Sequence, residues 1–269
     1  MQNLPAWTRE LRADVIRMIA AAGSGHPGGS LSVVDLLAVL YARHLRHDPK
    51  RPDWPERDRL ILSKGHACPA LYAVLARRGF FPQESLLTLR RLGSPLQGHP
   101  ERHRLPGIEA STGSLGQGLS IGLGLALAAR LDRRDWRVYV VTGDGELQEG
   151  QVWEAAMAAA KFKLGNLTLI ADCNDGQLDG PVHEIMPLAP LADKFAGFNW
   201  DARVIAGHDL GAIDAALAAV KSVPDRPQAI LAKTVKGKGV SFMEGDHAWH
   251  GKAPGREEAE QALREMLGA

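Results

Sequence analysis

The clearest candidate for a chemical site is an aspartate between two glycines that is followed thirty positions later by an asparagine. Asp144 comes at the end of the apolar run 137–142, and Asn174 directly follows the next apolar run, 167–173. In a parallel sheet the carboxyl ends of neighbouring strands share one edge, so both side chains should meet there. Carboxylate and amide oxygens suit Mg²⁺, which leaves further positions for phosphate and water. The pair predicts a magnesium site that a phosphorylated ligand completes.

Two other interpretations of this segment have less support. An Asp-Gly step is common in hairpin turns, but a helical pattern rather than a strand follows this one. The chain has neither a Walker loop nor a complete Gly-x-Gly-x-x-Gly, because Gln148 stands where the last glycine would be. Nucleotide and NAD binding therefore lose their main sequence support.

Histidines beside glycines form the second candidate group. Five of the ten histidines have a glycine neighbour, and they are His26, His66, His99, His208 and His250. We expect His208, in a predicted strand-to-helix turn, to be structural. The other four lie in loops, three of which also hold prolines, and imidazole can move protons at neutral pH. These four side chains could line one polar pocket.

Zinc is the competing interpretation of the histidines. The four are separated by 40, 33 and 151 residues, and no His-Glu-x-x-His element occurs. The chain holds only two cysteines, Cys68 and Cys173, too few for a cysteine-rich zinc site or a disulfide scaffold. We therefore disfavour zinc and expect a reducing, cytoplasmic location.

Composition limits the partners. The 269 residues carry 32 Lys and Arg against 31 Asp and Glu, so no basic excess indicates nucleic-acid binding. The most apolar stretch, 115–131, is interrupted by Gln117 and Ser120 and is too short for a membrane span. No linker divides the sequence, and we expect one large domain over residues 1–269 with no nucleic-acid or membrane partner.

Apolar runs alternate with helical patterns along the chain, which predicts an α/β fold with a parallel sheet and helices on both faces. Ser32, followed three residues later by Asp35, is typical of a capping box at the start of a helix. We predict helices over 7–22, 32–44, 68–78, 83–91, 113–131, 149–162, 191–198, 210–220 and 257–267, and strands over 60–62, 137–142, 167–173, 202–205 and 228–234.

Six short motifs hold most of these glycines, histidines and acids and span nearly the whole chain. They are Ser24-Gly25-His26-Pro27-Gly28, Ser63-Lys64-Gly65-His66-Ala67, Gln97-Gly98-His99-Pro100, Thr112-Gly113-Ser114-Leu115-Gly116-Gln117-Gly118, Gly143-Asp144-Gly145-Glu146 and Trp249-His250-Gly251. In this order, with Asn174 at the matching distance, they resemble the N-terminal, thiamine-diphosphate-binding portion of transketolase, encoded as a separate subunit.

The resemblance implies a role for each matching position. Mg²⁺ would be bound by Asp144, Asn174 and the carbonyl of Gly176. The cofactor thiamine diphosphate would be bound at its diphosphate by Gly145, His66 and His250, and at its aminopyrimidine by the backbone of Gly113, Ser114 and Leu115. The catalytic imidazoles His26, His99 and His250 would line the substrate channel. Glu149 and Glu154 match acids near the family's subunit contact.

The implied reaction transfers a two-carbon ketol unit from a ketose or ketose phosphate to an aldose or aldose phosphate. The family's pyrimidine-binding and C-terminal domains are absent from this sequence. A partner subunit would supply them, with the glutamate that activates the cofactor, in an α2β2 assembly. Two alternatives stay open: an α-type subunit of a 2-oxoacid dehydrogenase, and a non-catalytic thiamine-diphosphate-binding protein. The sugars and the pathway, pentose phosphate or specialised, also stay open.

Two positions depart from the family pattern. Lys161 stands where many relatives have histidine, outside the six motifs. Asp175 puts an extra acid beside the expected metal ligand Asn174. That acid could change the affinity for Mg²⁺ or face solvent, and the sequence does not distinguish the two.

Overall fold

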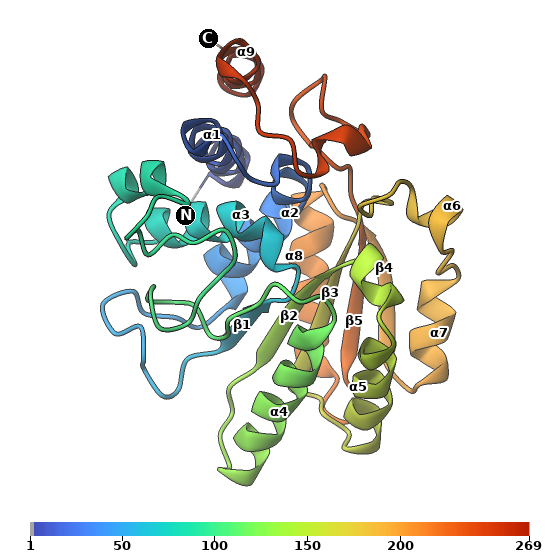
Figure 1. Ribbon diagram of the computed structural model, residues 1–269. Helices are drawn as coiled ribbons and strands as arrows, with labels where there is room; N and C mark the ends of the chain where they lie inside the picture. Colours follow the sequence, from blue (N-terminus) through green and yellow to red (C-terminus); the bar gives the residue numbers. More distant parts are fainter. Residues whose placement is uncertain (1–2, 269) are drawn as a thin grey trace.

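A five-stranded parallel sheet forms the centre of the computed structural model, which describes residues 3–268 (Figure 1). The strand order is β1-β2-β3-β5-β4, and every neighbouring pair is parallel. The strands are β1 Arg59–Leu62, β2 Val138–Gly143, β3 Leu167–Cys173, β4 Asp201–Ala206 and β5 Gln228–Lys233. The predicted α/β fold with a parallel sheet is confirmed, and all five expected strands are present.

Helices cover both faces of the sheet. One face packs against α1 Leu4–Ala22, α2 Pro27–Val39, α3 Cys68–Arg77, α8 Leu210–Ala219 and α9 Arg256–Leu267. The other packs against α4 Gln117–Leu131, α5 Gly150–Lys161 and α7 Leu191–Gly197, with the short α6 Val182–Ile185 between β3 and α7. Strand residues alternate between the two cores because successive side chains point to opposite faces: Tyr139 and Val141 join the first, and Val138 and Val140 join the second.

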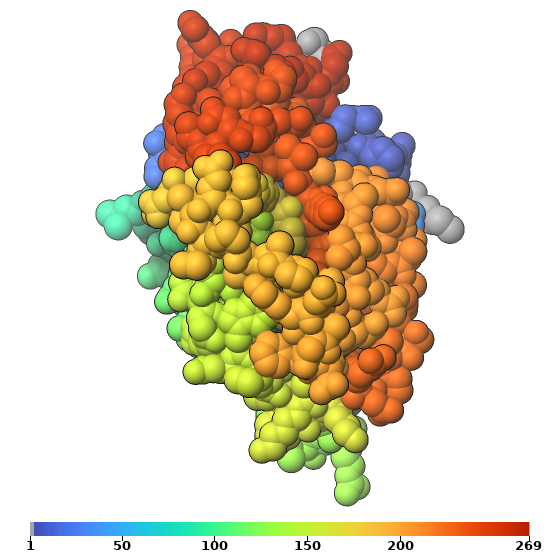
Figure 2. Space-filling model, turned by 90° about the vertical axis from the view of Figure 1, so that its right-hand side faces the viewer, coloured from blue at the N-terminus to red at the C-terminus, as the bar shows by residue number. Residues whose placement is uncertain are grey.

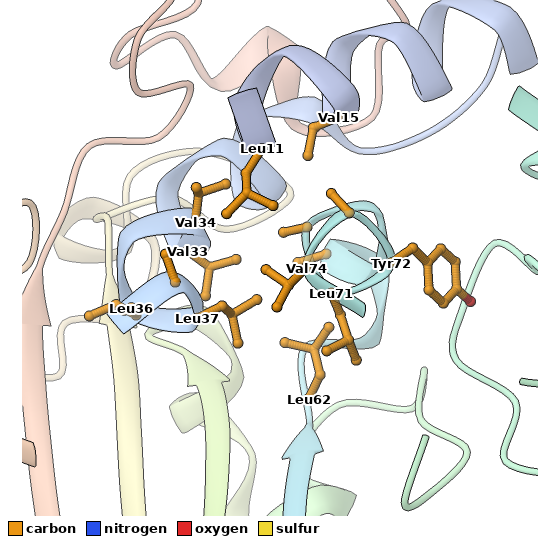
Figure 3. Close-up of a cluster of buried hydrophobic side chains, with 14 of the residues drawn as sticks. Leu11, Val15, Val33, Val34, Leu36, Leu37, Leu62, Leu71, Tyr72 and Val74 are labelled. Carbon is orange, nitrogen blue, oxygen red and sulfur yellow. The ribbon is translucent and has the colours of Figure 1, made fainter. Parts of the chain in front are cut away.

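The larger core fixes the loops that carry chemistry. Leu11 and Val15 of α1, Val34 of α2, Val74 of α3 and Leu62 of β1 meet in it (Figure 3). Each of these elements leads into one of the six motifs or directly follows one, so packing them together also brings their glycine-rich loops together. No helix within residues 3–268 has the length and apolar character needed to cross a membrane.

Three helix predictions were wrong, two in the residue where the helix begins and one in the type of helix, and α1 begins at Leu4 rather than at the predicted residue 7. The second helix begins at Pro27 rather than Ser32, because a proline at the first helical position loses no hydrogen bond. Ser32 is therefore inside the helix and forms no capping box, and a π-helical turn extends the helix over Leu40–His44. The predicted helix 83–91 is only a 3₁₀ segment, Gln83–Thr88. The glycine-rich helix begins at Gln117 rather than 113, because Gly116 has a φ of 82°.

Candidate active site

The site lies at the carboxyl edge of the sheet, where β2 and β3 end. Gly143 and Asp172 pair across these strands, which places the following Asp144 beside the loop that carries Asn174. A pocket of about 240 Å³ opens there, and its lining includes the predicted site residues His66, Leu115, Asp144, Gly145, Asn174, Gly176 and His250. Figure 2 shows this side of the molecule, where the yellow atoms of the segment that contains α6 lie below the red atoms of the C-terminal part of the chain.

Asp144 is a buried acid, 5% exposed, at the base of this pocket. Its Oδ1 accepts the Gly145 N–H at 2.9 Å, and its Oδ2 accepts the Asp175 N–H at 2.6 Å. Burial, and next the neighbouring carboxylate of Asp172, raise the pKa of Asp144 to about 6. A buried carboxylate whose hydrogen bonds come from backbone N–H groups is suited to a metal cation.

Asn174 is held in one orientation by its amide nitrogen. Nδ2 donates to Ser32 Oγ at 3.1 Å and to Asp172 Oδ2 at 3.3 Å, while Oδ1 accepts the Gly176 N–H at 3.0 Å. Asp172 is fully buried and also accepts hydrogen bonds from Ser32, Lys64 and Thr234. Because such partners fix how a metal ligand points, Ser32 and Asp172 are supporting residues that the sequence analysis missed.

Four imidazoles converge beside the pocket, as the loop positions of these histidines suggested. The ring centre of His26 lies 5.4 Å from that of His66, 6.1 Å from His99 and 5.6 Å from His250. The rings of His66 and His250 are 5.3 Å apart. His66 and His250 line the pocket. His26 is adjacent to both of them, and His99 is adjacent to His26.

All four imidazoles are neutral at physiological pH. Burial is the main cause in each case, and it lowers the pKa of His26 and of His250 to about 4. The pKa of His66 lies well below its ordinary value, and that of His99 is also lowered. Nearby cations add to the effect, Arg90 for His26 and Lys236 for His250. Each neutral ring offers one N–H donor and one acceptor nitrogen for hydrogen bonds with a ligand.

Two buried lysines give the pocket its positive charge, and neither was among the predicted site residues. Lys64 is 1% and Lys236 is 2% exposed, and both line the pocket. Lys64 pairs with Asp172 at 2.6 Å, whereas Lys236 has no carboxylate of residues 3–268 within ion-pair distance and its Nζ lies 2.9 Å from His250 Nδ1. Burial lowers the pKa of Lys236 to about 8. Lys64 stands inside the Ser63–Ala67 motif, while Lys236 lies in a segment predicted only as loop.

Glu146 joins the loops around the pocket. This 2% exposed acid accepts hydrogen bonds from Ser63 Oγ, from the Gly116 N–H at 2.8 Å and from the Gly143 N–H at 3.1 Å. It thereby holds the Gly113–Gly118 motif against the ends of β1 and β2. Leu115 of that motif lines the pocket, whereas Gly113 lies against the ring of His99 and Ser114 is exposed outside the pocket lining.

Of the remaining expected residues, Glu149 lines the pocket, whereas His208, Glu154 and Lys161 lie outside its lining. His208 binds Asp35 through Nδ1 at 2.7 Å and accepts the Val235 N–H through Nε2 at 2.8 Å, so it is structural as expected. Glu154 and Lys161 are exposed on α5, and Glu149 is exposed just before it. Within the described part of the chain, no three histidine, cysteine or acidic side chains are arranged to hold a metal, so amide and backbone oxygens have to contribute to any metal site beside Asp144.

Comparison with known proteins places this geometry in one family. Residues 6–269 match the model of the transketolase thiamine diphosphate binding domain. The chain is 48% identical to the 6-deoxy-6-sulfo-D-fructose transketolase subunit SqwG of Clostridium sp. (strain MSTE9), over 89% of both chains. It is 40% identical to an apulose-4-phosphate transketolase subunit from Phocaeicola vulgatus, over 99% of this chain and 94% of that protein.

Full-length transketolases are matched over part of their length only. The chain is 40% identical to the human enzyme, covering 99% of this chain and 42% of that one. The transketolase structure from Campylobacter jejuni superposes with a TM-score of 0.93 at 36% identity and covers 99% of this chain and 43% of that one. The chain belongs to the transketolase family, as the N-terminal, thiamine-diphosphate-binding subunit of a split transketolase.

Proposed function

We propose that this chain binds Mg²⁺ and the diphosphate of thiamine diphosphate in a two-component transketolase that moves a two-carbon ketol unit from a ketose to an aldose. The observation that carries the proposal is the pocket at the ends of β2 and β3. There Asp144 and Asn174 lie together with Lys236, His66 and His250. A metal-ligand pair, a buried lysine that contacts an imidazole instead of an acid, and neutral histidines together suit a magnesium diphosphate.

The residues that would hold the cofactor follow from their positions. Asp144, Asn174 and the carbonyl of Gly176 would bind Mg²⁺. The diphosphate would be met by Lys236, His66, His250 and the backbone of Gly145, and the aminopyrimidine by the Gly113–Leu115 backbone. Thiamine diphosphate, when bound, supplies the nucleophilic carbon and the electron sink for carbon–carbon bond cleavage.

The imidazoles would handle the protons of the sugar hydroxyls. The guanidinium of Arg90 lies 3.5 Å from His26 Nδ1, so Nδ1 is the acceptor of the neutral ring and Nε2 carries the hydrogen. His250 has the same tautomer, because Lys236 Nζ lies 2.9 Å from its Nδ1. Both rings then present an N–H donor at Nε2. We assign to His26, His99 and His250 the exchange of protons with substrate oxygens as the bond breaks and re-forms.

A second subunit would complete the site. The relatives named as subunits are matched over most of their length, whereas full-length transketolases extend well beyond this chain. We infer a partner that carries the pyrimidine-binding and C-terminal domains and the activating glutamate, in an α2β2 assembly. Because two relatives are named for an apulose phosphate and a sulfonated fructose, we infer a ketose donor with an anionic end group.

Reconstitution tests the proposal. The chain is purified alone and together with a transketolase-like C-terminal partner, and both samples are assayed with thiamine diphosphate, Mg²⁺ and a panel of phosphorylated and sulfonated ketoses with aldose acceptors. We expect ketol transfer only from the pair. Full activity of the chain alone would remove the need for a partner. Decarboxylation of pyruvate by the pair would favour a 2-oxoacid dehydrogenase, and cofactor binding without turnover would favour a non-catalytic protein.

A further inference from the structure

Asp175, the extra acid beside Asn174, points away from the metal-ligand pair. Its Oδ1 accepts the backbone N–H of His183 at 3.1 Å, and its Oδ2 lies 2.5 Å from His183 Nδ1. Both side chains are exposed, 51% for Asp175 and 65% for His183. The carboxylate therefore binds the far end of its own loop and is turned from the position where Mg²⁺ would lie.

The same two residues close a short loop at the pocket. The Val182 N–H donates to the Asp175 carbonyl at 3.0 Å, and the Gln177 N–H donates to the Gly180 carbonyl at 3.0 Å. A single antiparallel bridge joins Gly176 to Pro181. Segment 175–183 is thus a loop tied at its two ends, and its residues 176–178 line the pocket.

The backbone of Asp175 contacts the proposed metal site directly. Its N–H donates to Asp144 Oδ2 at 2.6 Å, and its φ of 57° turns the chain so that the side chain and the N–H serve different partners. Aspartate is among the few residues that adopt this left-handed conformation readily. One residue therefore joins Asp144 on one side to His183 on the other.

We propose that the Asp175–His183 pair is a positioning device, which holds loop 175–183 so that Asp144 and the Gly176 carbonyl are pre-arranged for Mg²⁺. The inference rests on the proposed function, because it concerns the same metal site. An exposed pair of this kind adds little to folding stability. Its main effect should fall on metal affinity, since partners behind a metal ligand commonly change that affinity by about 10- to 100-fold.

Calorimetric titration of Mg²⁺ into the full chain with excess thiamine diphosphate tests the pair. Asp175→Ala and His183→Ala should each raise the Kd for Mg²⁺ about tenfold, and the double variant should raise it no further than either single one. The melting temperature of the cofactor-free chain should not change. Asp175→Asn should recover part of the affinity, because it tolerates the same φ and still accepts the His183 N–H. Glu154→Ala, at an exposed position on α5 outside this loop, is the control and should bind like the wild type.

Hydrogen exchange separates this inference from the proposed function. In the cofactor-free chain, the amides of Gln177 and Val182 should exchange faster in both alanine variants than in the wild type. Faster exchange with an unchanged Kd for Mg²⁺ would overturn the positioning role while leaving the metal site in place. Unchanged exchange of these amides in both alanine variants would show that the pair does not hold the loop. A wild-type chain that binds no Mg²⁺ in the presence of thiamine diphosphate would overturn the proposed function itself.

Discussion

The Gly116 N–H donates a 2.8 Å hydrogen bond to Glu146, which joins a turn before α4 to the segment that follows β2. Ser63 and Gly143 bind the same carboxylate. Three loops from distant parts of the sequence thus share one buried acceptor, and its removal leaves their donors without partners.

Glu146→Ala should therefore destabilise the chain. We expect the free energy of unfolding to fall by about 3 kcal/mol, because two backbone N–H groups and one hydroxyl lose their buried acceptor. Urea denaturation measures the change. Glu154→Ala, an exposed acid on α5, is the control and should stay within about 0.5 kcal/mol of the wild type. Equal stabilities of the two variants would contradict the role of Glu146.

Asp144→Ala and His26→Ala separate binding from proton transfer. Asp144→Ala should abolish Mg²⁺-dependent binding of thiamine diphosphate, because the cation loses the only charged ligand that the protein supplies in the proposed site. His26→Ala should leave binding largely intact and slow ketol transfer by about 100-fold or more. Calorimetry measures binding, and the assay with the partner subunit measures transfer. Equal loss of binding in both variants would contradict these assignments.

Lys236→Met should change stability and cofactor binding in opposite directions. The folded chain keeps this lysine buried with a pKa of about 8, so a neutral side chain of similar size should raise the free energy of unfolding at pH 7 by about 1–3 kcal/mol. Affinity for thiamine diphosphate should fall about tenfold, because a charge-assisted contact is lost. Thermal melting and calorimetry measure the two effects. Lys238→Met, two residues away at a position that pairs with Glu244, should not weaken cofactor binding.

Stability should decrease as the pH falls from about 6.5 toward 4. His26 and His250 have folded pKa values of about 4 against 6.5 in the unfolded chain, so only the unfolded chain takes up protons in this range. Each ring contributes at most about 1.4 kcal/mol per pH unit. Urea denaturation of the cofactor-free chain at several pH values should show a shallower decline in His26→Asn than in the wild type.

The exposed His103 supplies the control for this pH dependence, since His103→Asn should leave the slope unchanged. Asp144, whose pKa is raised from 3.8 to about 6 in the folded chain, favours folding as the pH falls through that range. It is present in the wild type and in both histidine variants, so it does not affect the comparison of their slopes. Identical slopes in His26→Asn and the wild type would show that the buried ring does not resist protonation.

Gly145→Ala tests the close approach of two loops. A Cβ on Gly145 would lie 2.7 Å from Cβ of Gln177, so the loop after β3 would have to move. We expect affinity for Mg²⁺ with thiamine diphosphate to fall about tenfold while the chain still folds. Gly150→Ala is the matched control, because no neighbouring atom of residues 3–268 lies within 4 Å of its added Cβ, and a gain of about 0.5–1 kcal/mol in stability is expected. Unchanged affinity in Gly145→Ala would show that the loop tolerates the displacement.

Local patterns in the sequence determined the sheet and the identity of most pocket residues. Apolar runs of strand length predicted all five strands. Strands β1, β2, β3 and β5 are buried along nearly their whole length, which requires mainly apolar side chains, whereas the edge strand β4 is only partly buried. The Asp144 and Asn174 positions predicted the edge where the pocket lies, because parallel strands end on the same side. Helix boundaries at Pro27 and Gly116 were misjudged, since a proline start and a left-handed glycine override periodicity.

Only the tertiary structure decided which side chains meet. Asp172 is the second-last residue of the mainly apolar strand β3. Its side chain contacts Ser32, 140 positions before it in the sequence, and Lys64, 108 positions before it. No local pattern encodes such a pairing, because it depends on how α2 packs on the sheet. The same holds for Lys236, whose loop becomes part of the pocket through packing, and for Asp175, whose φ and contact with His183 turn its carboxylate away from the metal ligands.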